Sequence, residues 1–313
     1  RLKLTTSIGI AVSPKHGETP KDLFLIADNM MYKAKKAGKN CIVIPTEEEM
    51  AEVFRMASDK NLMIQRALDE KRIRPYFQPI SNANTGNIQI HELLMRIEID
   101  DHIVTANDFI EVAESMGIVH KMDYQLIEQA FIQVNLQGYS GMLFINLSPK
   151  SLIVGEFIAR VRALAEAADI EPQRIVFEIT ERETVSNLSL LEKFVQELKL
   201  QGFSFAIDDF GSGFSSFQYI KHFPIDYIKI EGEFIKNIVK DEVYRAFIKS
   251  IVTLAQELGI KTIAEHIEDA NILVMAREFG VDYAQGYHIG RPSSKFFDHN
   301  MQTETSHEQR DYT

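Results

Sequence analysis

Eight short apolar runs recur from residue 75 to residue 290, and this rhythm restricts the possible folds more than any other feature of the chain. Amphipathic stretches with helical spacing separate the later runs, at 155–168, 187–200 and 242–258. An alternation of strands and helices with eight strands predicts an α/β protein built as a (β/α)8 barrel. The runs lie at 75–80, 88–97, 142–148, 175–181, 203–210, 226–232, 261–267 and 283–290.

The first two runs are joined too tightly for a helix to lie between them. Only the residues SNANTGN (81–87) separate them, whereas a crossover between parallel strands needs about a dozen residues or more. We therefore expect these two strands to be antiparallel. The predicted fold is a TIM-like barrel with one reversed strand.

The residues before the barrel predict a separate and smaller unit. Two strand-like runs, 4–12 and 41–44, flank a helical pattern that Pro20 opens. This is too little chain to bury a core, so we interpret it as the end of a larger domain. The predicted boundaries are 1–46 for this remnant, 47–71 for a connecting helix without Gly or Pro, 72–298 for the barrel and 299–313 for a polar tail.

Charge and cysteine content exclude some classes of function. The net charge is -11, with 34 Lys and Arg against 45 Asp and Glu, which argues against binding to polymeric nucleic acid. Cys41 is the single cysteine, so an internal disulfide is impossible and a reducing, cytoplasmic setting is expected. No apolar run reaches the ~18 residues that span a bilayer, although a longer parent protein could be membrane-anchored with this part in the cytosol.

The alternation of side chains along a strand predicts which residues point into the barrel. In the run 203–210, Ala206 and Asp208 share the interior face, while Phe205 and Ile207 face the surrounding helices. Catalytic groups of barrel enzymes lie at the mouth formed by the carboxyl ends of the strands, so polar residues there predict an active site. The same alternation directs further polar side chains inward: Glu92, Arg96, Asn146, Glu178, Lys229, Glu231 and Glu265.

Several carboxylates in one pocket do not stabilise a fold, because like charges repel and their desolvation is costly. Cations that neutralise them would make the arrangement tolerable. The oxygen-only set of Glu92, Asn146, Glu178 and Asp208 suits Mg²⁺ or Mn²⁺ better than Zn²⁺, and Asp209 could reach a second ion. Each residue alone could equally be a strand-end cap or a solvated charge, but their convergence at successive strand ends favours a metal site.

The other polar groups leave alternatives open. Lys229 is a structural counter-ion or a group that orients a water or a phosphate oxygen, and the two roles are compatible. Glu265 is a metal ligand or the general base that takes a proton from an attacking water. Arg96 suits a bidentate phosphate contact, with a surface salt bridge as the alternative. Together these groups predict metal-assisted hydrolysis of a phosphate ester, without identifying the ester.

The motifs that carry these residues resemble one known family. They are HELLMR (91–96), NLS (146–148), FEITE (177–181), DDFGSGFSSF (208–217), DYIKIEG (226–232), AEHIE (264–268) and QGY (285–287). In this order they resemble the EAL-domain family of cyclic di-GMP phosphodiesterases, over about 75–295. The front segment, with TSIGIA (6–11) and ADNMMYKAKKAGKN (27–40), is similar to the last third of a GGDEF diguanylate cyclase domain. The GGDEF signature itself does not occur, so no cyclase activity is expected.

The resemblance implies a role for each matching position. Glu92, Asn146, Glu178 and Asp208 would hold the first of two ions, Mg²⁺ or Mn²⁺, and Asp209 would share the second or bridge the two. Lys229 and Glu265 would position and deprotonate the nucleophilic water, while Glu181 would hold the loop after Asp209. Arg96 would bind a substrate phosphate, and Gln285 would complete the contacts to metal, water or substrate. The product would be the linear dinucleotide pGpG.

Three positions depart from the usual motifs of the family. The EAL motif reads Glu92-Leu93-Leu94, which changes only an apolar residue. The usual KID reads KIE, so the longer Glu231 stands where the aspartate would help to hold the second ion. The usual AEG reads AEH, and His266, of opposite parity to Glu265, is expected to pack outward or toward a loop. Of these departures, only Glu231 could impair the second metal.

Three functions therefore compete. The first is an active cyclic di-GMP phosphodiesterase, which the retained first-metal residues and Lys229 favour. The second is a degenerate receptor that binds cyclic di-GMP without turnover, and the third is a barrel enzyme for another phosphoester. The resemblance also implies a homodimer and a parent protein with upstream sensor or GGDEF domains.

Overall fold

The computed structural model describes residues 4–100, 102–148, 156–182, 188–212, 220 and 223–297. The predicted polar tail, 299–313, lies outside these residues. The chain divides into two compact units after residue 66, and each is described by itself. No described helix combines the length and the apolar character that a membrane span requires.

The first unit is a small parallel strand pair with one helix against it. Strand β1 (Ile8–Gly9) pairs with β2 (Ile42–Val43), and α1 (Pro20–Lys36) lies between them in sequence. The Thr19 hydroxyl caps α1 by accepting the N–H of Asp22 at 3.1 Å. Both strands are shorter than the predicted runs, because only two residue pairs are in register. Helix α2 (Glu47–Asp69) begins in this unit and crosses the division.

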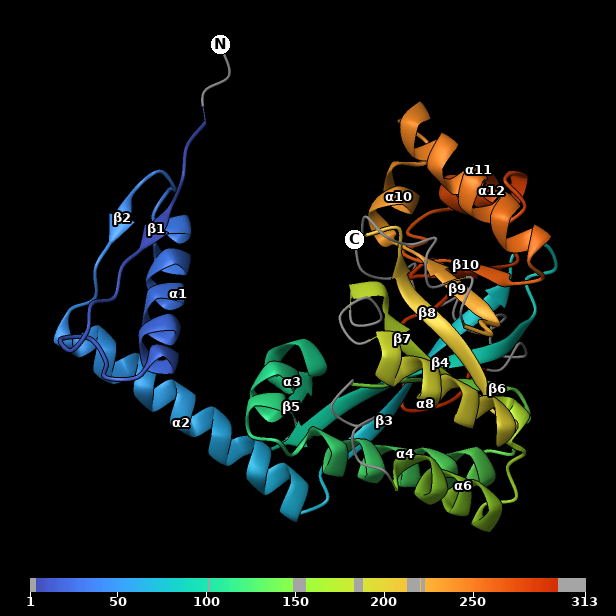
Figure 1. Ribbon diagram of the computed structural model, residues 1–313, viewed down its shortest axis with the longest axis horizontal. Coiled ribbons are helices and arrows are strands. Elements are labelled where there is room, and N and C mark those ends of the chain that lie inside the picture. Colours follow the sequence, from blue (N-terminus) through green and yellow to red (C-terminus); the bar gives the residue numbers. More distant parts are fainter. Residues whose placement is uncertain are drawn as a thin grey trace, which may run out of the picture. The chain divides into compact units, whose positions relative to one another are not determined.

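The second unit contains a closed barrel of eight strands (Figure 1). The strands are β3 (Ile73–Asn82), β4 (Ile88–Ile99), β6 (Met142–Asn146), β7 (Ile175–Thr180), β8 (Ser204–Phe210), β9 (Tyr227–Ile230), β10 (Lys261–Ala264) and β11 (Tyr283–Gln285). Their order around the barrel is β3-β11-β10-β9-β8-β7-β6-β4, and a β3–β4 pairing closes it. Strand β3 is antiparallel to both neighbours while the other barrel pairs are parallel, which confirms the TIM-like barrel with one reversed strand.

Helices surround the strands and one short strand extends the sheet (Figure 1). Strand β5 (His102–Thr105) pairs antiparallel with the outer part of β4. The sequence did not predict it, because four residues with two polar ones carry little strand signal. Among its described residues, the helices of the unit are α3 (Ala106–Ser115), α4 (Val119–Leu136), α6 (Phe157–Ala167), the 3-10 turn η1 (Pro172–Arg174), α8 (Leu188–Leu200), α10 (Gly232–Asn237), α11 (Glu242–Glu257) and α12 (Ala270–Glu278).

An apolar layer fills the barrel and fixes which side chains point inward. Its buried members are Ile80, Ile90, Phe144, Val176, Ala206 and Ile263, with Met142, Tyr227 and Tyr283 packed against them. Because strand side chains alternate, the next inward position lies two residues further along each parallel strand. That position comes toward the carboxyl ends, so the apolar layer forms the floor of one mouth of the barrel.

Candidate active site

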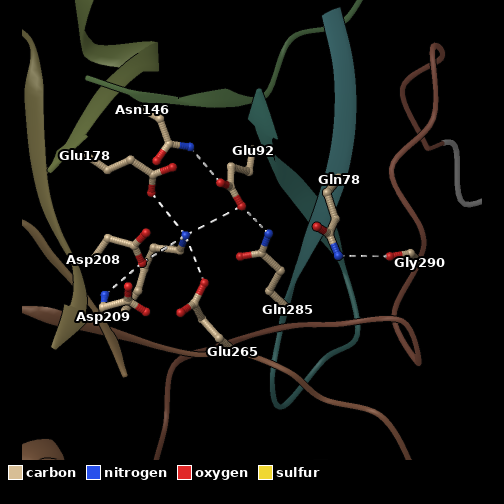
Figure 2. Close-up of polar contacts among 10 residues, drawn as sticks. Gln78, Glu92, Asn146, Glu178, Asp208, Asp209, Glu265, Gln285 and Gly290 are labelled. Carbon is tan, nitrogen blue, oxygen red and sulfur yellow. Dashed lines mark hydrogen bonds and ion pairs between the residues drawn. The ribbon is translucent and has the colours of Figure 1, made fainter. Parts of the chain in front are cut away.

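Seven of the barrel strands each contribute one polar side chain to a layer next to the apolar floor, and an eighth comes from the residue that directly follows β10. Figure 2 shows these side chains. The layer consists of Gln78, Glu92, Asn146, Glu178, Asp208, Lys229, Glu265 and Gln285. Glu92 lies two residues beyond Ile90, and Glu265 two beyond Ile263. In the reversed strand β3 the order is inverted, so Gln78 lies two residues before Ile80 and directly opposite Glu92.

Lys229 lies at the centre of this layer and contacts four carboxylates. Its Nζ is 3.0 Å from Glu265 Oε1, 3.2 Å from Asp208 Oδ1, 3.3 Å from Glu178 Oε2 and 3.5 Å from Glu92 Oε2. Its side chain is only 1% exposed. Burial alone would lower the lysine pKa, but the four carboxylates raise it well above its usual value. Lys229 is therefore a fully charged cation within a buried acidic cluster.

Hydrogen bonds hold the Glu92 carboxylate on both sides (Figure 2). The Asn146 amide donates to Oε1 at 2.8 Å, and the Gln285 amide donates to Oε2. Burial tends to raise the Glu92 pKa, but Lys229 and these two amides lower it below the usual range. Glu92 is thus fixed in position and ionised.

In Glu178 and Glu265 the ionised form of the carboxylate is disfavoured. Burial raises the pKa of Glu178 well above its usual value, with Glu92 and Asp208 adding to the effect and Lys229 opposing it. Burial and Asp208 raise the pKa of Glu265 to about 8, again against Lys229. One lysine therefore does not suffice to keep the whole cluster ionised near neutral pH.

A bulge at the end of β8 brings two consecutive aspartates to the mouth. The β8–β9 register shifts between Ile207 and Phe210, and Asp209 has a left-handed φ of 52°. This departure from strand geometry lets Asp209 lie beside Asp208 rather than on the opposite face. Ligand oxygens of Asp208, Asp209 and Glu265 lie within 4.8 Å of one another.

Glu181 supports the loop that follows this bulge. It is fully buried, and its Oε2 accepts the backbone N–H of Gly211 at 2.8 Å. Gly211 has a φ of 108°, and a Cβ there would lie 2.3 Å from the Phe234 ring. The contact ties the end of β7 to the turn after Asp208 and Asp209, although much of the DDFGSGFSSF motif, 213–217, lies outside the described residues.

Glu231 and His266, the two polar residues that differ from the usual family motifs, lie at the rim of the site. Glu231 is the N-cap residue of α10, after β9 has ended, and it does not belong to the group formed by Asp208, Asp209 and Glu265. Burial and the nearby Asp209 raise its pKa, while Arg182 lowers it. His266 has a φ of 52° and its ring packs against Gly232.

Arg96 extends beyond Glu92 on the same face of β4. Its Nη1 donates to the Met95 carbonyl at 2.8 Å, and its guanidinium carbon lies 5.6 Å from the centre of the Tyr76 ring. No ion pair links it to a carboxylate of the described residues, so the surface salt bridge that the sequence left open is not formed there. The guanidinium is half-buried, and it is available for an anion.

The polar layer opens into a cavity of about 350 Å³. Gln78, Lys236 and Tyr287 are among the wall residues that the sequence did not predict as site residues. Gln78 could have been found by applying the alternation backwards along the reversed strand, whereas Lys236 lies beyond the strand ends and carried no signal. Tyr287 belongs to the QGY motif, but the motif predicted no role for Tyr287 itself. A larger cavity of about 950 Å³ lies at the opposite end of the barrel, but its wall contains no carboxylate.

The donor set fits divalent cations. Oε1 of Glu178 and the amide oxygen of Gln285 are buried without a hydrogen-bond donor, and the other Glu178 oxygen has only Lys229 beside it, at 3.3 Å, so oxygen ligands remain unused. Five carboxylates, from Glu92, Glu178, Asp208, Asp209 and Glu265, face the one ammonium of Lys229. When all five carboxylates are ionised, their surplus of four negative charges over Lys229 equals the charge of two divalent cations, and oxygen ligands are those that Mg²⁺ and Mn²⁺ prefer.

Comparison with curated proteins gives named relatives of the chain. It is 33% identical over 296 residues to the cyclic di-GMP phosphodiesterase PdeB of Shewanella oneidensis, covering 93% of this chain and 35% of that protein. It is 33% identical over 233 residues to the cyclic di-GMP phosphodiesterase PdeF of Escherichia coli, covering 73% of this chain and 31% of that protein. The chain therefore spans about a third of the length of these relatives.

Solved structures of similar fold include proteins with a bound nucleotide. The MucR phosphodiesterase of Pseudomonas aeruginosa, in its c-di-GMP complex, is 26% identical with a TM-score of 0.71, covering 75% of this chain and 97% of that one. The FimX EAL domain from Pseudomonas aeruginosa, bound to c-di-GMP, is 26% identical with a TM-score of 0.72, covering 77% and 99%.

Family models match both parts of the chain. The diguanylate cyclase, GGDEF domain, matches residues 1–41, so the first unit is a fragment of that domain. The EAL domain matches residues 61–292, which include the whole barrel and every residue of its polar layer. By this match, and by the relatives that share it, the chain belongs to the EAL domain family.

Proposed function

We propose that this chain hydrolyses cyclic di-GMP to linear pGpG with two Mg²⁺ or Mn²⁺ ions. The observation that carries the proposal is the convergence of five carboxylates and Lys229 at the mouth of an EAL-family barrel. Relatives named cyclic di-GMP phosphodiesterases support the substrate. The single cysteine supports a cytoplasmic setting for the reaction.

Six residues of the site would hold the two ions of the proposed reaction. Glu92, Asn146, Glu178 and Asp208 would hold one ion, and Asp209 with Glu231 would hold the second. When bound, the ions would polarise a phosphoryl oxygen and lower the pKa of a bound water.

The remaining groups act on the water and the substrate. Glu265 accepts the proton of the water that attacks phosphorus, and Lys229 orients that water. The bond from phosphorus to the ribose 3′ oxygen breaks, and the leaving oxygen takes up a proton. Arg96 and Gln285 hold the substrate, while Glu181 holds the loop after Asp209.

Separation of the reaction products tests the proposal. The protein is incubated with cyclic di-GMP and Mg²⁺, Mn²⁺, Ca²⁺ or excess EDTA, and nucleotides are resolved by chromatography. We expect pGpG with Mg²⁺ or Mn²⁺, slow turnover with the larger Ca²⁺, and none in EDTA. Binding of cyclic di-GMP without any product would instead identify a receptor, and full activity in EDTA would contradict the metal mechanism.

Replacing Arg96 by alanine should weaken substrate binding more than it slows chemistry. The guanidinium would contact a phosphate that is present in the ground state, so its loss should raise KM about tenfold or more while kcat changes little. Steady-state kinetics with cyclic di-GMP measure both constants. Arg74→Ala is the matched control, because that arginine is already paired with Glu98 at 2.9 Å. Equal effects of the two substitutions would argue against a phosphate contact.

Metal binding should stabilise the protein more at pH 8 than at pH 6. The folded metal-free site holds a proton on Glu265, whose pKa is about 8, that the unfolded chain releases near its usual pKa of 4.5. Stability of the metal-free protein from this group therefore falls as pH rises between these values. A divalent cation displaces the proton, so its affinity rises over the same range. Thermal unfolding with Mn²⁺ or EDTA at both pH values measures the difference, and a larger shift at pH 6 would contradict it.

The upstream domains of the parent protein and the oligomeric state of the barrel are predicted from the family resemblance alone. We expect upstream sensor or GGDEF domains in the full-length protein and a homodimer of the barrel unit. Light scattering on the purified chain would measure its mass in solution. The first unit, similar only to a fragment of a GGDEF domain, is expected to make no cyclic di-GMP from GTP.

A further inference from the structure

His266 has an unusual backbone conformation at the edge of the candidate site. Its φ of 52° lies in the left-handed region, which a residue with a side chain keeps only when its surroundings hold it there. The backbone of the next residue provides such an anchor. Ile267 donates its N–H to the Gln285 carbonyl at 2.9 Å, and its own carbonyl accepts the N–H of His288 at 3.0 Å.

The imidazole of His266 is packed directly on the first residue of α10. A Cβ added to Gly232 would lie 1.9 Å from Cδ2 and 2.7 Å from Nε2 of His266. Such distances do not occur between real atoms, so any other residue at position 232 would displace the ring or the helix. The absence of a side chain at Gly232 therefore permits the close approach.

A second close contact holds the other side of the same short helix. The Phe234 ring lies against Gly211, where an added Cβ would be 2.3 Å from Cε2. Gly211 in turn is bonded to the buried Glu181. Helix α10 is thus held between His266, at the end of β10, and the loop that follows Asp208 and Asp209 at the end of β8.

The position of α10 determines where Glu231 can reach. Glu231 directly precedes Gly232 and is the N-cap residue of the helix, and its backbone N–H donates to the Phe210 carbonyl at 3.2 Å. A shift of Gly232 would move Glu231 with it, because the two are consecutive. The Glu231 carboxylate lies close enough to Asp209 for that aspartate to raise its pKa.

We propose that His266 is a positioning residue for Glu231. Its imidazole sets the distance between the first turn of α10 and β10, and so sets how closely the Glu231 carboxylate approaches the metal-binding carboxylates. The proposal rests on the proposed function in that it assumes a divalent cation bound at this mouth.

A double-mutant cycle on the contact tests the proposal. The proteins are wild type, Gly232→Ala, His266→Gly and the double variant, each titrated with Mn²⁺ by calorimetry without substrate. Supporting contacts of metal ligands typically change affinity about 10- to 100-fold, so Gly232→Ala should weaken Mn²⁺ binding about tenfold or more. His266→Gly should weaken it less, and the double variant should recover to about the level of His266→Gly, since the added methyl then has room.

Thermal unfolding separates positioning from simple packing. Glycine is favoured over histidine at a left-handed φ. His266→Gly should therefore lose Mn²⁺ affinity without losing thermal stability. Gly141→Ala is the control, because its Cβ would lie 2.3 Å from the Gln89 carbonyl at the far end of the barrel. It should lower the melting temperature and leave Mn²⁺ affinity unchanged.

The Mn²⁺ titrations test the role of His266, and hydrolysis of cyclic di-GMP tests the proposed function. The role of His266 would be overturned if the two substitutions had additive effects on Mn²⁺ affinity. It would also be overturned if neither substitution changed that affinity, or if the wild-type protein bound no Mn²⁺. Hydrolysis of cyclic di-GMP by such a wild type would leave the proposed activity standing. The expected cycle together with no hydrolysis would support His266 and contradict the enzymatic proposal alone.

Discussion

Replacing Lys229 by methionine should sharply destabilise the metal-free protein at pH 8 and reduce hydrolysis about 100-fold or more. The methionine fills similar space but leaves four carboxylates without the cation that lies 3.0 to 3.5 Å from each. Breaking a buried ion pair by removing one partner costs about 3–5 kcal/mol. For a domain of this size, that corresponds to a fall in melting temperature of about 10 °C.

The pH dependence of this loss identifies its cause. At lower pH the orphaned carboxylates take up protons, which removes part of the penalty, so the loss should be smaller at pH 6 than at pH 8. Thermal unfolding in EDTA at the two pH values measures it. Saturating Mn²⁺ should restore most of the stability, because a divalent cation can neutralise the same carboxylates.

A second lysine provides a matched control. Lys199 contacts Asp226 at 2.7 Å, but both side chains are half-buried, at 31% exposure, so water screens the pair far more than it screens Lys229. Pairs that water reaches typically contribute about 1 kcal/mol or less. Lys199→Met should therefore cost little and show no recovery with Mn²⁺. A Lys229→Met protein as stable as the Lys199→Met protein would show that Lys229 does not neutralise the cluster.

The interior of the barrel could be predicted from the sequence because strand alternation has an exact period of two. Strand alternation predicts that Ala206 and Asp208 both point into the barrel. The structure places Ala206 in the apolar floor and Asp208 in the polar layer. The seven-residue link between the first two strands predicted the reversed strand by length alone. These inferences needed only the regular part of each strand.

The rim of the site could not be predicted in the same way, because the alternation stops where the strands end. Asp209 and His266 both have a left-handed φ, which redirects the chain immediately after an inward residue. Glu231 shares parity with Lys229, yet it is already the N-cap of a helix. Tertiary contacts such as that between His266 and Gly232 decide these positions, and no local pattern encodes them.

Replacing Glu265 by glutamine should lower kcat by about 100-fold or more while cyclic di-GMP affinity changes little. Glutamine keeps the shape of the side chain and an oxygen that can accept from Lys229, now 3.0 Å away, but it cannot take up a proton from water. Glu268→Gln is the matched control, since Glu268 is an exposed glutamate in the wall of the same cavity. That variant should retain kcat within about threefold, because it removes no base from the reacting water.

Metal dependence of the Glu265→Gln rate distinguishes a general base from a metal ligand. Glu265 lies within ligand reach of Asp208 and Asp209, so its loss could act through the ions alone. In that case saturating Mn²⁺ should restore kcat, because the weakened site would again be filled. A general base gives the opposite result: kcat stays low at every Mn²⁺ concentration, since no added cation replaces the missing proton acceptor. Recovery of the wild-type rate at high Mn²⁺ would therefore remove Glu265 from the proton transfer and leave it as a ligand.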